Sequence, residues 1–252
     1  MDITFLETDL INTKVDKPLS GTLSGHAAGE PFDKYVETLL KAKSQNVFRQ
    51  YEYLNNLYTA NISKISFEDR ANLIPYKSVQ YLLNRGKKTT IEWTKSNIFE
   101  EKQNDTADIL AIESNFFQIL DVKTKNLSKK AMQPNIISAL KLAEACKLIL
   151  EFKEDKVFNI TYIGIDWQEE GKYLVCKKAY VRELFKCPPA MLYINWSAAL
   201  QIQFHVDELN QSYTGNINDW ANDFLKHFVS KAKSRVAKME KDWIKNYELA
   251  IK

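Results

Sequence analysis

Apolar residues near the start of the chain recur at the spacing of helices. Phe32, Tyr35, Val36, Leu39 and Leu40 repeat every three or four positions, which predicts a helix from about Pro31. The region 48–98 keeps this spacing and is expected to be mostly helical, with breaks near Pro75 and Gly86. Before these helices, the stretch 20–29 holds three of the seven glycines and is expected to be a loop.

The spacing changes after about residue 106. Short apolar runs bounded by turn residues predict strands at 107–112, 116–123, 159–167, 173–180, 191–196 and 200–206. Two amphipathic helices are also expected, at about 135–150 and about 218–247. The apolar stripe of the last helix indicates core or a subunit interface. This order predicts one α/β domain over 1–252, with a central mixed sheet flanked by helices and a long C-terminal helix.

Composition supports an ordinary globular protein. Of 252 residues, 45% are hydrophobic and 27% charged, which is enough apolar material for a substantial core. Residues 1–18 lack a basic segment followed by an apolar one, and no apolar run has the length of a membrane span, so a cytoplasmic location without membrane contact is expected.

Cysteines and histidines have no spacing typical of disulfide frameworks or zinc sites: Cys146, Cys176, Cys187, His26, His205 and His227.

Candidate chemistry lies in the two strands around Ser114-Asn115. A hairpin turning there pairs residues whose numbers sum to 229, so Asp108 faces Asp121. Like charges directly opposed across strands are destabilising, unless a cation bridges them. Hard carboxylate oxygens suit Mg²⁺. Lys123 shares the face of Asp121, since side chains alternate along a strand, and the three groups together predict metal-assisted phosphodiester hydrolysis.

Charge distribution is consistent with a nucleic-acid partner. The net charge of +3 is only mildly basic, but a cluster of lysines directly follows the hairpin: Lys123, Lys125, Lys129 and Lys130. Basic residues of the C-terminal segment are interspersed with acidic ones and are expected to form a solvated helix face.

Longer blocks of sequence resemble a known family. Residues 20–32, 48–55, 99–110, 120–129, 134–143, 193–206 and 225–229 are similar to type II restriction endonucleases of the HincII/HindII kind, within the PD-(D/E)xK nuclease superfamily. The resemblance implies a restriction-endonuclease-like core and a homodimer that requires Mg²⁺ and cuts double-stranded DNA at the palindrome GTYRAC, leaving blunt ends. It also implies a DNA methyltransferase in the same system, which is not a stable subunit.

The resemblance also implies roles for particular residues. Asp108 and Asp121 correspond to the metal-binding carboxylates, the Val122 carbonyl to a further metal ligand, and Lys123 to the catalytic lysine. Ala107 stands where the superfamily motif has proline, a departure with no chemical consequence. Segments near 129–135 and 193–206 are expected to read DNA, with Met132 wedging between bases from the minor groove. The DNA-contacting set is Gln103, Asn104, Lys125, Lys129, Lys130, Met132, Gln133, Asn135 and Asn195.

Two other functions remain compatible with the residues. A non-cleaving, sequence-specific DNA-binding protein would explain the lysines and polar loops but not the paired carboxylates. A repair or junction-resolving nuclease on the same fold would keep the chemistry and change the substrate.

Overall fold

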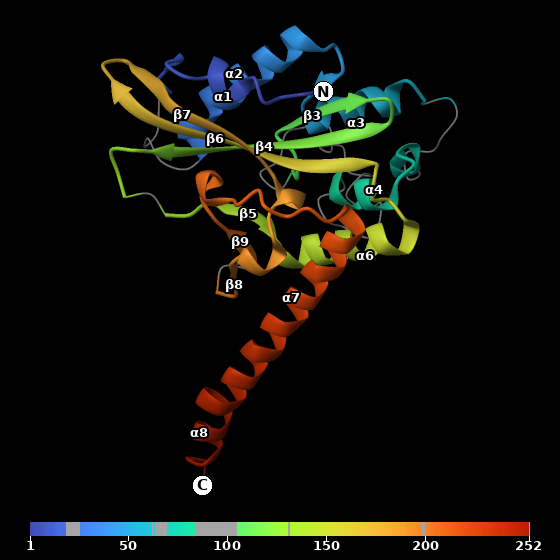
Figure 1. Cartoon of the computed structure of the whole chain (residues 1–252), viewed down its shortest axis with the longest axis vertical. Coiled ribbons are helices and arrows are strands. Elements are labelled where there is room, and N and C mark those ends of the chain that lie inside the picture. Colours follow the sequence, from blue (N-terminus) through green and yellow to red (C-terminus); the bar gives the residue numbers. More distant parts are fainter. Residues whose placement is uncertain are drawn as a thin grey trace.

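The computed structural model describes residues 1–18, 26–61, 63, 70–83, 105–130, 132–197 and 200–251. Within this part, the chain forms a curled mixed sheet with helices on its two faces, and a long C-terminal helix that projects from the body (Figure 1). The α/β architecture expected from the sequence is therefore confirmed. Among the described residues, no helix combines the length and apolar character needed to span a membrane.

The main sheet has six strands in the order β1-β7-β6-β4-β3-β2. Neighbouring strands are antiparallel except β4 and β6, which are parallel. Its strands are β1 (Lys14–Asp16), β2 (Val47–Phe48), β3 (Ile109–Glu113), β4 (Phe116–Asn126), β6 (Phe158–Glu170) and β7 (Tyr173–Glu183). A parallel pair needs a long crossover between its strands. Here the crossover between β4 and β6 contains β5 and α6, so the crossover helix expected from the sequence is present.

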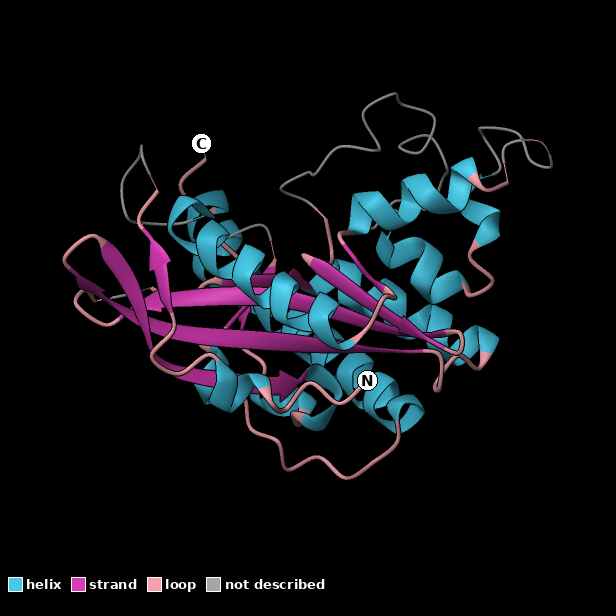
Figure 2. Cartoon of the chain, turned by 90° about the horizontal axis from the view of Figure 1, so that it is seen from above, coloured by secondary structure: helices cyan, strands magenta, loops and turns pink. Residues whose placement is uncertain are grey.

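Helices cover the sheet on opposite faces (Figure 2). Along β4, Phe117 and Ile119 pack into one core, whereas Leu120 and Val122 pack into the other. The helices that pack with Leu120 are α1 (Leu6–Asp9) and α2 (His26–Lys43); those that pack with Ile119 include α4 (Lys77–Leu83), α6 (Ala139–Phe152) and α7 (Ile217–Met239). The sheet is thus buried on two sides, as strands with near-continuous apolar runs require.

A second, three-stranded sheet has the order β5-β9-β8. It consists of β5 (Asn135–Ser138), β9 (Gln201–Gln203) and β8 (Ile194–Asn195). Short single-turn helices connect the remaining parts: η1 (Arg70–Leu73), η3 (Leu184–Lys186), η4 (Pro189–Met191) and η5 (Val206–Glu208). α3 (Gln50–Thr59) follows β2, and the chain ends with a π-helical turn, η6 (Glu240–Ile244), and α8 (Lys245–Glu248).

Several sequence-based boundaries were wrong. The helix expected from 135 begins at Ala139, because residues 135–138 pair with β9 and Ser138 caps the helix. The strands expected at 191–196 and 200–206 are reduced to two and three residues, since η4 and η5 occupy their ends. The loop expected at 20–29 is helical from His26, and Gly29 packs against Thr124 of β4. The glycines at 21 and 25 and the helical expectation for 84–98 lie outside the described residues.

The C-terminal helix matches its expected range except for the π-helical turn. Trp220 and Phe224 are buried in the core, so the first turns of the apolar stripe do serve as core. Further along, Val236 is 66% exposed and Trp243 49% exposed. The distal half of the stripe therefore contributes nothing to the core of this chain.

Candidate active site

The hairpin between β3 and β4 has the expected turn and register. Ser114 and Asn115 have φ values of 48° and 70°, the pair of positive values that a type I′ hairpin turn requires. Ile109 pairs with Leu120 and Glu113 with Phe116, so paired residue numbers sum to 229. This part of the prediction is confirmed. The regular ladder ends at Ile109 with Leu120. The backbone N–H of Asp108 donates to the carbonyl of Leu120 at 3.0 Å, and because these numbers sum to 228, Asp108 lies one residue out of that register and does not pair regularly with Asp121.

The register brings the expected catalytic residues together. Asp108 Oδ2 accepts a hydrogen bond of 2.8 Å from the backbone N–H of Val122. Lys123 Nζ donates to Asp121 Oδ1 at 2.6 Å. Because Asp121 is buried and the Lys123 side chain is only 23% exposed, this ion pair is shielded from bulk water on most sides.

Burial and mutual charge perturb these groups in a coupled way. Burial raises the pKa of the Asp121 carboxyl well above its usual range, and the neighbouring Asp108 carboxylate raises it further, while Lys123 opposes the shift. Burial acts to lower the pKa of the Lys123 ammonium, but the carboxylates of Asp121, Asp108 and Asp33 outweigh it and raise the pKa. The site therefore concentrates negative charge around a single ammonium group.

Asp33 is an acidic neighbour that the sequence did not reveal. It lies on α2, is buried, and acts on Lys123 through its charge. A carboxylate next to Phe32 and Val36 on the buried face of a helix was the available signal. Such a residue needs a polar or charged environment, because an isolated buried carboxylate is costly.

The donor set fits a hard divalent cation. Mg²⁺ in proteins commonly takes one or two carboxylates and completes its shell with water and phosphate oxygens. Asp108 and Asp121 would supply two carboxylates, and the Val122 carbonyl is the further ligand that the family resemblance implies. Within the described residues, no group of three or more His, Cys, Asp or Glu side chains has metal-binding geometry.

The two segments expected to read DNA meet in the small sheet. Asn135 is the first residue of β5 and Asn195 the last of β8, and β9 lies between them. Gln203 on β9 links the two. Its Nε2 donates to Asn135 Oδ1 at 2.7 Å, and its Oε1 accepts from Asn195 Nδ2 at 2.8 Å. The sequence analysis missed Gln203, because its contacts depend on strands far apart in the sequence.

The remaining expected DNA-contacting residues lie around the end of β4. Lys129 and Lys130 are exposed, and Met132 is 90% exposed. Gln133 donates to Glu208 at 2.8 Å, and Lys125 Nζ lies 3.5 Å from Asp207 Oδ2. A small recess connects this region to Lys123, since Lys123, Lys125, Pro134 and His205 line it together. Gln103 and Asn104 lie outside the described residues.

The cysteines and His227 behave as expected for structural residues. Cys146, Cys176 and Cys187 are free and buried. Burial raises the pKa of Cys176 and of Cys187 to about 11, which keeps these thiols protonated and unreactive near neutral pH. His227 contacts the carbonyl of Leu192 through Nε2 at 3.1 Å. The three cysteines and His227 take no part in the candidate site, whereas His205 lines the recess beside Lys123.

Known proteins similar to this chain point to one family. The family model for restriction endonuclease HincII matches residues 6–251. The type II restriction enzyme HindII of Haemophilus influenzae strain Rd is 49% identical over 243 residues, covering 96% of this chain and 94% of that enzyme. The type II restriction enzyme HincII of Haemophilus influenzae has the same identity and coverage. With a match of this extent, the chain belongs to the HincII family of type II restriction endonucleases.

Proposed function

We propose that this chain is a Mg²⁺-dependent endonuclease that cuts both strands of duplex DNA at the palindrome GTYRAC, at its centre, and leaves blunt ends. The observation that carries the chemistry is the convergence of Asp108, Asp121 and Lys123 at the end of the β3–β4 hairpin. The site sequence is proposed from the likeness to HincII and HindII.

Asp108 and Asp121 are the residues that would hold the cation against the scissile phosphate. When bound, Mg²⁺ supplies a Lewis acid that polarises the phosphate and lowers the pKa of a coordinated water. The Val122 N–H donates to Asp108 Oδ2, which fixes the orientation of that carboxylate. Asp121 is fixed in the same way by the ammonium of Lys123. Carboxylates held by hydrogen bonds bind a metal with less ordering cost than free ones.

Lys123 has a second task during hydrolysis. As a water oxygen bonds to phosphorus, the bond from phosphorus to the leaving sugar oxygen breaks, the water loses a proton and the leaving oxygen gains one. Negative charge grows on the phosphoryl oxygens during this exchange. An ammonium group in a water-poor site stabilises that charge more than it does in bulk water.

DNA recognition is assigned to the small sheet and the lysines beside it. The carboxamides of Asn135 and Asn195 suit hydrogen bonding to base edges. Lys125 and the exposed Lys129 and Lys130 would neutralise phosphates, and the exposed Met132 would wedge between bases from the minor groove. Gln133, and also Gln103 and Asn104 in the preceding segment, complete the proposed contact set.

A palindrome presents two equivalent half-sites, so we propose that the working form is a homodimer with one active site on each strand. A host carrying such an enzyme needs a DNA methyltransferase of matching specificity, acting separately. The chain is accordingly expected to work on DNA in the cytoplasm.

The test is cleavage of unmethylated plasmid DNA by purified protein with Mg²⁺. Discrete fragments are expected, and sequencing their ends gives the site and the cut position together. Asp108→Ala and Lys123→Ala should bind DNA but lose at least about 100-fold in cleavage rate. Lys177→Ala is the matched control, because Lys177 pairs with Glu170 on the surface, away from the site.

Each alternative has a distinct outcome. A non-cleaving DNA-binding protein would bind a specific site and leave the plasmid intact. A repair or junction-resolving nuclease would ignore intact plasmid and cut branched or damaged DNA. Full activity of Lys123→Ala would refute the proposed role of the lysine.

A further inference from the structure

A buried glutamine holds the backbone that leads into Asp108. Gln50 is the first residue of α3 and is 1% exposed. Its Oε1 accepts hydrogen bonds from the backbone N–H groups of Thr106 and Ala107, at 3.1 and 3.0 Å. Its Nε2 donates to the carbonyl of Leu83 and to Asp105 Oδ1, each at 3.1 Å. One side chain therefore contacts three successive residues immediately before Asp108.

These four bonds use the complete hydrogen-bonding capacity of a carboxamide. Glutamine has two N–H donors and an oxygen that accepts two bonds. A methionine of similar shape would leave the N–H groups of Thr106 and Ala107 without this partner in a buried setting. A glutamate would place a carboxylate against the Leu83 carbonyl and the Asp105 carboxylate. No other common side chain reproduces this pattern, so the contact is specific to glutamine.

The contact matters because residues 105–107 belong to no strand. Backbone contact with β4 begins only at Asp108, whose N–H donates to Leu120, and regular pairing begins at Ile109. Ahead of that point, side chains anchor the segment. Thr106 Oγ1 donates to the carbonyl of Leu82 at 2.6 Å and lies 3.3 Å from Lys141 Nζ. Gln50 is the anchor that binds the backbone itself.

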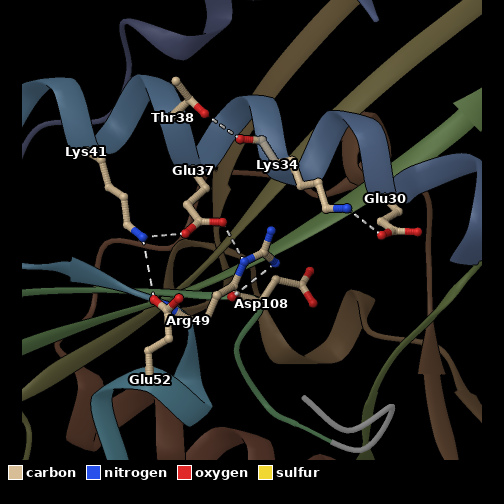
Figure 3. Close-up of polar contacts among 8 residues, drawn as sticks. All are labelled: Glu30, Lys34, Glu37, Thr38, Lys41, Arg49, Glu52 and Asp108. Carbon is tan, nitrogen blue, oxygen red and sulfur yellow. Dashed lines mark hydrogen bonds and ion pairs between the residues drawn. The ribbon is translucent and has the colours of Figure 1, made fainter. Parts of the chain in front are cut away.

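The neighbouring residue, Arg49, adds a weaker contact to the same place. Its Nη1 lies 3.5 Å from the carbonyl oxygen of Asp108. Figure 3 shows the guanidinium between that carbonyl and Glu37, whose Oε2 accepts from Arg49 Nε at 2.6 Å. Lys41 bridges Glu37 and Glu52, and Glu52 accepts from the backbone N–H of Arg49. The start of α3 is thus held rigidly beside the catalytic hairpin.

We infer that Gln50 is a positioning residue for the metal-binding carboxylate of Asp108. This inference rests on the proposed function. Gln50 touches neither the carboxylate nor the expected cation; it fixes the backbone at 105–107 and so the place from which the Asp108 side chain extends. Partners of metal ligands typically contribute 10–100-fold to metal affinity or activity, and about that size is expected here.

The test compares Gln50→Met with Gln118→Met. Gln118 also donates through Nε2 to a backbone carbonyl, that of Met1 at 3.0 Å, but it lies on β4 away from residues 105–107. In metal-free protein, the amides of Thr106 and Ala107 should exchange with solvent about tenfold faster in Gln50→Met, because each loses a hydrogen bond. Cleavage should slow by about 10–100-fold, with a higher Mg²⁺ concentration for half-maximal rate. DNA affinity should stay close to that of Gln118→Met. The thermal midpoint of Gln50→Met should be lower, because its buried N–H groups lose their partner, so cleavage is compared at a temperature where both variants are folded.

Thr106→Val keeps the test decisive if Gln50→Met does not fold. It removes one anchor of the same segment and leaves Gln50 in place, so a smaller change in the same direction is expected. The inference would be overturned by any of three results for Gln50→Met: unchanged amide exchange, an unchanged Mg²⁺ dependence of cleavage, or a loss of cleavage that merely follows a loss of DNA binding. Failure of the proposed function looks different, because wild type and Gln118→Met would then be as inactive as Gln50→Met.

Discussion

Replacing Gly164 with alanine tests how tightly the sheet is packed beside Lys123, the proposed catalytic lysine. Gly164 on β6 pairs with Lys123 on β4 and with Tyr180 on β7. A Cβ at this position would lie 2.6 Å from Val206 Cβ, 3.0 Å from Val206 Cγ1 and 3.3 Å from Tyr180 Cδ2. Val206 Cβ is bonded directly to the backbone, so no rotation of the valine moves it away. Either η5 or β6 must shift.

The expected cost follows from overpacking. Adding a methyl group to a well-packed interior typically costs about 1–3 kcal/mol, and the shortest contact here places Gly164→Ala in the upper half of that range. Urea unfolding followed by circular dichroism measures the change in the free energy of unfolding. Cleavage should also slow, because β6 is the strand that supports Lys123.

Gly29→Ala is the matched comparison with the opposite sign. Gly29 lies inside α2, and an added Cβ would meet Thr124 Oγ1 at 3.5 Å, Thr124 Cγ2 at 3.7 Å and Asp33 Oδ1 at 3.9 Å, all ordinary contacts. Alanine in a helix is favoured over glycine by about 0.5–1 kcal/mol, so this variant should be more stable than wild type. Equal stability changes in the two variants, or a neutral Gly164→Ala, would refute the packing argument.

Three further predictions concern stability. The buried Glu154 carboxylate caps α4, because it accepts hydrogen bonds from the N–H groups of Lys77 and Ser78 at 2.7 and 2.8 Å. Glu154→Gln should therefore lower the free energy of unfolding by about 1–3 kcal/mol. A loss below about 0.5 kcal/mol in urea unfolding would contradict this. Burial raises the pKa of the Glu37 carboxyl, but hydrogen bonds and charges from Lys41 and Arg49 outweigh burial, so the pKa is lowered overall. The ionised Glu37 therefore stabilises the folded protein above the unfolded pKa near 4.5, and this stabilisation is lost as pH falls through the lower folded pKa. Wild type and Glu37→Gln should accordingly converge in thermal midpoint on acidification, and a constant difference down to acid pH would count against it. Ser114→Asn should raise the free energy of unfolding by roughly 0.5–1 kcal/mol, because asparagine tolerates the positive φ of 48° better than serine. Chemical denaturation that shows no gain in stability would argue against strain in this turn.

Local sequence patterns determined the catalytic hairpin. Turn residues at Ser114-Asn115 and the apolar runs beside them allow one register with the apolar faces buried, and a slip of one residue would turn every side chain to the wrong face. The structure has that register. The closeness of Asp108, Asp121 and Lys123 therefore followed from the sequence, although the regular pairing ends at Ile109 and Asp108 is bonded one residue out of that register. Their chemical roles are proposals that the cleavage experiment tests.

Boundaries near 135 and 200 did not follow from local patterns. "NIIS" suits a helix or a strand by composition, and pairing with β9 decided for the strand. Similarly, the apolar pattern of residues 191–206 predicted two longer strands, and it did not show that η4 and η5 shorten β8 and β9. Short apolar segments are ambiguous on their own, and contacts across the chain resolve them.

The sequence by itself determined the α/β class, the hairpin with its register, and the closeness of the three candidate catalytic residues, Asp108, Asp121 and Lys123. Only the tertiary structure decided which residues support them. Gln50 is 55 residues from Asp105 in the chain, and Gln203 is 68 residues from Asn135, yet each pair is hydrogen-bonded. Periodicity reports which face of an element is apolar. It carries no information about which distant polar group a buried amide will meet, because that depends on how whole elements pack together.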